Sequence, residues 1–157
     1  MNVAWGANWA WGVSLIALTL GMHAVGLVVI GLILARIENR LGSQSLGRAG
    51  ELAGGALIIG MAGLMLAILH GIEAALWGAV YLFVGAVNVY SDAILYSVDS
   101  ISTRGASGLN LQQHWEMMGA LEAVDGMLLF GISTAFLFTV LARLWHRLAL
   151  VPSTSHC

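Results

Sequence analysis

Three long apolar runs constrain the fold of this chain more than any other feature of its sequence. They cover residues 13–34, 53–87 and 117–142. A helix of about 20 apolar residues is long enough to cross the hydrocarbon core of a bilayer. Only 9% of the 157 residues are charged, whereas a soluble domain has roughly 25%. We therefore expect an all-α membrane protein with three transmembrane helices.

The second run is unusually long, since residues 53–87 would form a helix of about 52 Å. Splitting it at Gly71 would give two short halves with no proline or turn-forming cluster between them. A single helix that tilts or projects from the bilayer is therefore preferred.

Between the second and third runs lies a stretch too short to cross the bilayer. Residues 91–102 fit a helix that reaches only about 18 Å, and residues 103–108 form a glycine-containing loop. Non-helical backbone at membrane depth is tolerated only where it is buried in protein or faces a water-filled cavity. The pattern indicates a re-entrant pore helix followed by a pore loop, as in a channel subunit.

The chain has six arginines and no lysine, and the positions of these arginines predict the topology. Three lie in the polar segment 36–52, two follow the last run, and Arg104 lies in the loop 103–108. By the positive-inside rule, segment 36–52 is a cytoplasmic loop and the tail 145–157 is also cytoplasmic. The N-terminus is then outside the inner (plasma) membrane. Three spans with a re-entrant loop satisfy this arrangement, whereas four spans would not.

Residues 1–35 are expected to form an interface segment and an extra transmembrane helix. Trp5, Trp9 and Trp11 are suited to the membrane–water interface. His23 lies in the middle of the first apolar run, and an ionisable residue inside a membrane is by default a functional hypothesis. The favoured interpretation is a neutral imidazole that is hydrogen-bonded to a neighbouring helix.

Several ordered pieces of the second half of the chain share a family pattern. They are HGIEAALW at 70–77, AILYS at 93–97 followed by Ser102 and Thr103, Trp115, ALEA at 120–123 and GMLLFGISTAFLF at 126–138. Together they resemble the two-transmembrane pore module of the potassium-channel superfamily, most closely its bacterial members.

The resemblance implies a pore module over residues 53–144 that assembles as a homotetramer. Its parts would be an outer helix 53–87, a pore helix 91–102, a filter loop 103–108 and an inner helix 117–142. The function it implies is a channel for monovalent cations, without enzyme activity and without a cofactor. The expected partners are further copies of the chain, the lipid bilayer and the permeant ions.

The filter sequence departs from the family, which carries TVGYGD. An ungapped alignment places here Thr103, Arg104, Gly105, Ala106, Ser107 and Gly108. Ser107 stands where the family has its second glycine, whose left-handed backbone lets carbonyl groups point at the ion. Strict potassium selectivity is therefore not expected.

Arg104 has three possible placements. The family places this side chain behind the filter, and Asp99 lies near the end of the pore helix, where some relatives carry a carboxylate. The resemblance thus implies an Asp99–Arg104 pair that clamps the loop. Alternatively, four Arg104 side chains in the ion path would favour anions, or the side chain extends to the outer mouth.

Glu122 and Asp125 share one face of the last helix, and acidic residues in a span rarely face lipid. The neighbouring Gly126 falls where the family's inner helix bends and lines the cavity. A ring of Asp125 carboxylates would concentrate cations there. Glu122 either joins the cavity or forms a hydrogen bond with a neighbouring helix or the pore helix.

No motif predicts a catalytic site, and no basic run predicts nucleic-acid binding. His70 with Glu73, and His114 with Glu116, each offer two metal ligands, but no Cys or further His is spaced along the sequence to complete a site. No metal site is therefore predicted. The alternative function is a non-conducting or sensory membrane protein that kept the pore fold.

Overall fold

The computed structural model describes residues 3–41, 47–105, 108–112 and 114–150. Every regular element in these residues is a helix, namely α1 (Val3–Leu41), α2 (Arg48–Phe83), α3 (Tyr90–Ile101) and α4 (Glu116–Leu150). Three of them, α1, α2 and α4, are long and apolar enough to cross a membrane. The expected all-α fold with three helices able to span a bilayer is confirmed.

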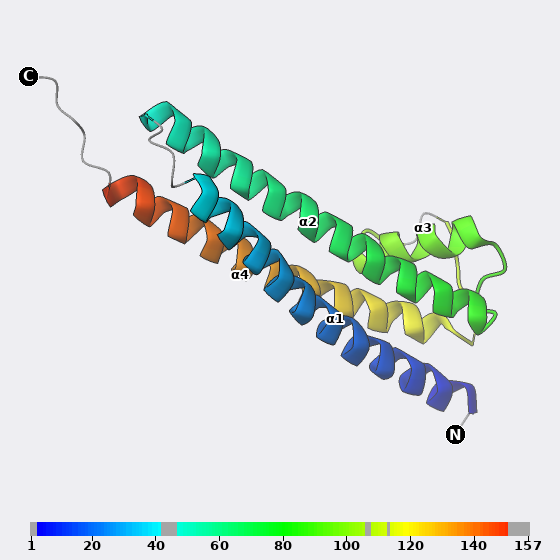
Figure 1. The fold of residues 1–157 in the computed structure, drawn as a ribbon. Coiled ribbons are helices and arrows are strands. Elements are labelled where there is room, and N and C mark those ends of the chain that lie inside the picture. The colour runs from blue at the N-terminus through cyan, green and yellow to red at the C-terminus, as the bar shows by residue number, and fades with distance from the viewer. Residues whose placement is uncertain (1–2, 42–46, 106–107, 113, 151–157) are drawn as a thin grey trace, which may run out of the picture.

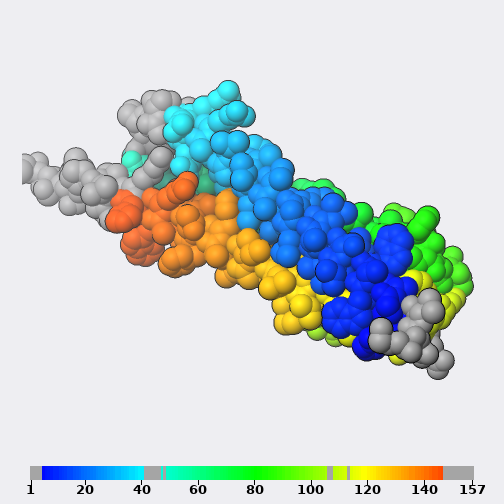
Figure 2. All heavy atoms as spheres, turned by 90° about the horizontal axis from the view of Figure 1, so that it is seen from below, coloured from blue at the N-terminus to red at the C-terminus, as the bar shows by residue number. Residues whose placement is uncertain are grey.

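The three long helices lie side by side, and α3 lies at the end of the bundle where α2 ends and α4 begins (Figure 1). Both α1 and α3 pack against α2 and α4, but within the described residues the backbones of α1 and α3 do not come close to each other. Figure 2 shows α1 lying along α4. The α2–α4 pair therefore separates the N-terminal helix from the short one.

Two helices extend beyond the apolar runs that predict them. Because α1 continues to Leu41 and α2 begins at Arg48, most of segment 36–52 is helical rather than the expected loop. The physical reason is that Arg, Glu and Leu are good helix formers, so a helix continues where hydropathy falls. Residues 42–46 lie outside the described residues. The run that begins at residue 53 is one helix, which confirms the choice against a split at Gly71.

At its other end α2 is closed by a turn in which two N–H groups bond back to carbonyls of the last turn. Gly85 N donates to Leu82 O at 3.1 Å, and Ala86 N donates to Tyr81 O at 2.8 Å. Gly85 adopts φ of 70°, a left-handed backbone that glycine tolerates because it has no Cβ. The helix therefore ends at Phe83, before the apolar run ends at residue 87.

The short helix α3 ends in the same kind of turn. Thr103 N donates to Ser100 O at 2.9 Å, and Arg104 N donates to Asp99 O at 3.0 Å. Here the left-handed position is taken by Thr103, with φ of 57°, which is unusual for a β-branched residue. The chain therefore turns away from the axis of α3 where the predicted filter loop begins.

Glycines of α2 and α4 let α3 approach both helices closely. A Cβ at Gly78 would lie 3.2 Å from the carbonyl oxygen of Ala93 in α3. On α4, a Cβ at Gly119 would overlap the Tyr96 hydroxyl, and a Cβ at Gly126 would overlap the Ile101 carbonyl. Small residues at helix contacts allow the backbones to meet, so these glycines determine how deeply α3 is inserted.

Replacing Gly126 by Ala should therefore displace α3, because the overlapping atoms belong to its backbone and cannot rotate away. Overpacking of this kind costs roughly 1–3 kcal/mol, so the melting temperature of the purified protein in detergent should fall by several degrees. Gly131→Ala is the matched control on the same helix, since a Cβ at Gly131 meets no atom of the described chain within 4 Å. It should leave the melting temperature equal or slightly higher, because Ala favours helix more than Gly. Equal melting temperatures of the two variants would contradict the close packing of Gly126 against α3.

Candidate functional site

The described residues of the predicted filter loop lie at the surface of the single chain. Thr103, Arg104, Gly105 and Gly108 are exposed, and Ala106 and Ser107 lie outside the described residues. Gly105 and Gly108 have φ of 82° and 80°, so both use the left-handed backbone that favours glycine.

The contact predicted between Asp99 and Arg104 is present. Arg104 Nη2 lies 2.8 Å from Asp99 Oδ1 and 3.1 Å from Asp99 Oδ2. The two side chains differ in environment, because that of Asp99 is 3% exposed and that of Arg104 is 65% exposed. The guanidinium thus covers a buried carboxylate from the solvent side, rather than being buried with it.

A second group of polar side chains is enclosed between the helices, and we call it the polar ladder. Its members are Thr19 and His23 of α1, His70, Glu73, Trp77 and Tyr81 of α2, Ser97 of α3, and Glu122, Asp125 and Ser133 of α4. Glu73, Trp77 and Tyr81 are four residues apart along α2, so they lie on one face of it, one turn above another. The ladder therefore has three layers, one for each of these residues.

The layer nearest α3 surrounds Glu122. Tyr81 Oη donates to Glu122 Oε2 at 2.7 Å, and Ser97 Oγ of α3 forms a hydrogen bond with Glu122 Oε1. Ser97 Oγ also lies 2.6 Å from the backbone oxygen of Ala74. Glu122 therefore joins α4 to both α2 and α3, which is the hydrogen-bonded alternative considered for it.

The middle layer surrounds Asp125. Its Oδ2 accepts hydrogen bonds from Thr19 Oγ1 at 2.6 Å and from Trp77 Nε1 at 3.0 Å. Within the described residues, its Oδ1 has no hydrogen-bond partner. This layer ties α1 and α2 to α4 through one carboxylate.

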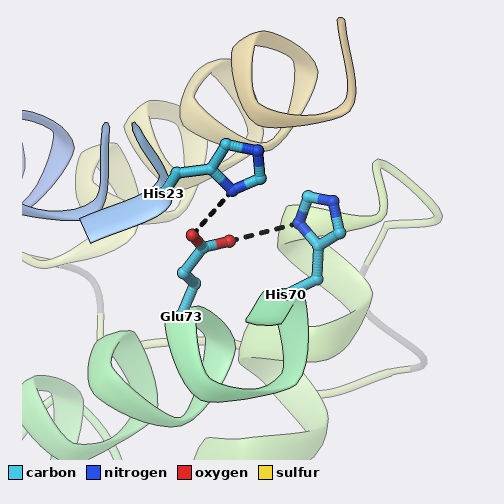
Figure 3. Close-up of side chains that lie close together, drawn as sticks. All are labelled: His23, His70 and Glu73. Atoms are coloured by element: carbon cyan, nitrogen blue, oxygen red, sulfur yellow. Dashed lines mark hydrogen bonds and ion pairs between the residues drawn. The ribbon is translucent and has the colours of Figure 1, made fainter. Parts of the chain in front are cut away.

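The third layer brings two histidines onto Glu73 (Figure 3). His23 Nδ1 lies 2.9 Å from Glu73 Oε1, and His70 Nδ1 lies 3.2 Å from Glu73 Oε2. Ser133 Oγ lies 3.1 Å from Nε2 of His23 and 3.1 Å from Nε2 of His70. The hydrogen bond from His23 to a neighbouring helix is thus present, and three metal-ligating residues meet at one point.

Glu122, Asp125 and Gly126 lie inside the single chain, and the expected ring of Asp125 carboxylates stays a prediction. The side chains of Glu122 and Asp125 are 0% exposed in the single chain. Gly126 lies against the end of α3. The reason is that donors from α1, α2 and α3 inside the same chain enclose both carboxylates.

Sequence reasoning missed the ladder because its members come from different helices. His70 and Glu73 were recognised as a pair, but His23, which completes the cluster, is far from them along the chain. The available signal was weak: Thr19 and His23 are four apart, as are Glu73 and Trp77. His114 and Glu116, the other pair considered, are exposed and form no such cluster in the described part of the chain.

The exposure of Arg104 determines how strongly it should couple to Asp99. Because solvent screens the guanidinium, Arg104→Ala and Asp99→Asn should each cost about 1 kcal/mol, less than the roughly 3–5 kcal/mol typical of a fully buried pair. The double variant should be more stable than the sum of the single effects by more than about 0.5 kcal/mol. Unfolding of the four proteins in detergent measures this coupling.

Arg40→Ala, at the far end of α1, is the matched control for this cycle. When Arg40→Ala is combined with Asp99→Asn, the two changes in the free energy of unfolding should add, because distant sites do not couple. If the effects of Asp99→Asn and Arg104→Ala on stability also added, the contact between the two side chains would contribute nothing to holding the loop.

Comparisons with known proteins identified no relative of this chain. No protein-family model matches the chain, and searches of curated proteins and of solved structures also found no match. What this protein does therefore has to be inferred from its own side chains and helices.

Proposed function

We propose that the chain is the subunit of a homotetrameric channel that conducts monovalent cations without strict potassium selectivity. The observation that carries this proposal is the position of α3, a helix of 12 residues that packs against α2 and α4 at one end of the bundle. An exposed loop with left-handed glycines follows it directly. A helix too short to span, followed by irregular backbone, suits a re-entrant element beside a water-filled path.

Four copies are proposed because a single chain contributes only one such loop, and a closed ring needs rotational symmetry. The outward face of α4 carries exposed apolar side chains, among them Met127, Phe130 and Phe138. Neighbouring copies and lipid would cover these surfaces.

The proposed cation preference rests on the charges near the loop. Asp99 and Arg104 neutralise each other at 2.8 Å, so the guanidinium adds no net positive charge to the path. The C-terminal end of α3 carries the negative end of its helix dipole, which favours cations. Glu122 and Asp125 are enclosed and have no part in this preference.

A non-conducting or sensory protein remains the second candidate. It is favoured by Thr103, whose left-handed backbone turns the chain at the start of the loop, and by the serine at the position of the second filter glycine.

Ion flux from liposomes that contain the purified protein distinguishes the two candidates. K⁺ and Na⁺ should pass at similar rates and Cl⁻ much more slowly, and native mass measurement of the same preparation should give four chains. Arg104→Gln should increase the preference for cations, since it leaves Asp99 without its counter-charge. Arg40→Gln, the matched control at the other end of the bundle, should not. If no monovalent ion moves at any pH or voltage, the chain is not a channel and the second candidate holds.

We further propose that the N-terminus lies outside and the C-terminus in the cytoplasm of the plasma membrane, on the distribution of arginines. Cys157, the single cysteine, offers the test. A thiol reagent that cannot cross membranes should label it only after the cells are opened. Labelling of Cys157 in intact cells would reverse the proposed orientation.

A further inference from the structure

We propose that His23, His70 and Glu73 bind one divalent transition-metal ion, of the class of Zn²⁺, between α1 and α2. This inference goes beyond the proposed channel function and does not depend on whether the chain conducts. It rests on ligand geometry, on the count of protons in the cluster and on the partners of both imidazoles.

The three ligands are already close to the spacing that a metal requires. One ligand atom from each residue lies within 4.8 Å of the other two, and Glu73 is 2.9 Å from His23 Nδ1 and 3.2 Å from His70 Nδ1. Ligands at about 2.0–2.1 Å from a tetrahedral Zn²⁺ lie roughly 3.4 Å apart. On binding, ligand atoms that are now up to 4.8 Å apart would draw together by at most about 1.4 Å through rotation of the side chains.

When both imidazoles are neutral and Glu73 is ionised, the hydrogen bonds of the cluster leave one contact without a proton. If His23 Nδ1 donates to Glu73, its Nε2 must accept the single hydroxyl proton of Ser133. His70 Nε2 then donates to Ser133 Oγ, and the lone pair of His70 Nδ1 faces a carboxylate oxygen. In agreement with this count, neither His70 Nδ1 nor Glu73 Oε2 has a partner with hydrogen-bond geometry among the described residues, although they lie 3.2 Å apart. A cation between these two atoms would remove the conflict.

Ser133 is placed as a partner for metal-bound histidines. Its Oγ lies 3.1 Å from the Nε2 atoms of both rings, opposite the Nδ1 atoms that face Glu73. With a metal on both Nδ1 atoms, both Nε2 atoms carry protons, and one hydroxyl oxygen can accept both. Histidine ligands commonly donate their second N–H to such a partner, which fixes the ring orientation.

The surroundings suit a divalent cation of intermediate softness. Two imidazole nitrogens and one carboxylate oxygen match Zn²⁺, Co²⁺ or Ni²⁺ better than Mg²⁺ or Ca²⁺. Glu73 and the carboxylate of Asp125 in the adjacent layer would together balance the charge. The His70 side chain is 11% exposed, so the cluster is not completely closed by the helices, and a fourth ligand would enter from that side.

The test measures metal binding to the full chain in detergent, after the protein has been treated with a chelator. The background protein carries His114→Gln, His146→Gln, His156→Gln and Cys157→Ser, which removes the histidines and the cysteine outside the cluster. It should bind one Zn²⁺ per chain, and its Co²⁺ form should give the visible absorption of a tetrahedral site. Zn²⁺ should also raise its melting temperature.

His70→Gln and Glu73→Gln in this background should each abolish the stoichiometric binding. Ser133→Ala keeps all three ligands, and it should weaken the affinity by roughly 10–100-fold without removing the site. It also keeps the test decisive if a ligand variant does not fold, since it leaves every ligand in place. Absence of Zn²⁺ binding by the background protein, or equal affinity of that protein and Ser133→Ala, would overturn the proposal. The cluster would then be a hydrogen-bonded one that holds a proton.

Discussion

The need to enclose three carboxylates inside a bilayer controls the arrangement of this protein. An acidic side chain at the centre of a membrane helix costs roughly 3 kcal/mol by insertion scales unless it faces protein or water. Glu73, Asp125 and Glu122 are each 0% exposed and each contacts donors from other helices. Since moving any long helix by one turn would separate these partners, the ladder determines the register of α1, α2 and α4.

The N-terminal helix is bound into the structure by the same polar contacts. Thr19 meets Asp125 and His23 meets both Glu73 and Ser133, while near the start of α1 the Asn8 side chain accepts from Met118 N at 3.1 Å. Because the backbones of α1 and α3 share no close contact within the described residues, α1 is connected to α3 mainly through α2 and α4. A metal in the third layer would strengthen that connection.

The short helix is held by a different means, which combines close backbone contact with a few hydrogen bonds. Gly78, Gly119 and Gly126 admit it, and Ser100 Oγ donates to Gly119 O at 2.9 Å. The loop that follows is exposed in one chain. The packed part of α3 can therefore fix where the loop begins while the described residues of the loop stay at the surface.

The three long helices and the short one can be predicted from the sequence alone, because backbone groups in a bilayer must be satisfied within each helix. The helix expected over 91–102 is found at Tyr90–Ile101, and the Asp99–Arg104 contact, five residues apart, is likewise local. The contacts of Asp125 with Thr19 and Trp77, and of His23 with His70 and Glu73, are visible only once the helices are packed. The rotation of one helix against another sets these contacts, and helices that are apolar on nearly every face carry little periodicity from which that rotation could be read.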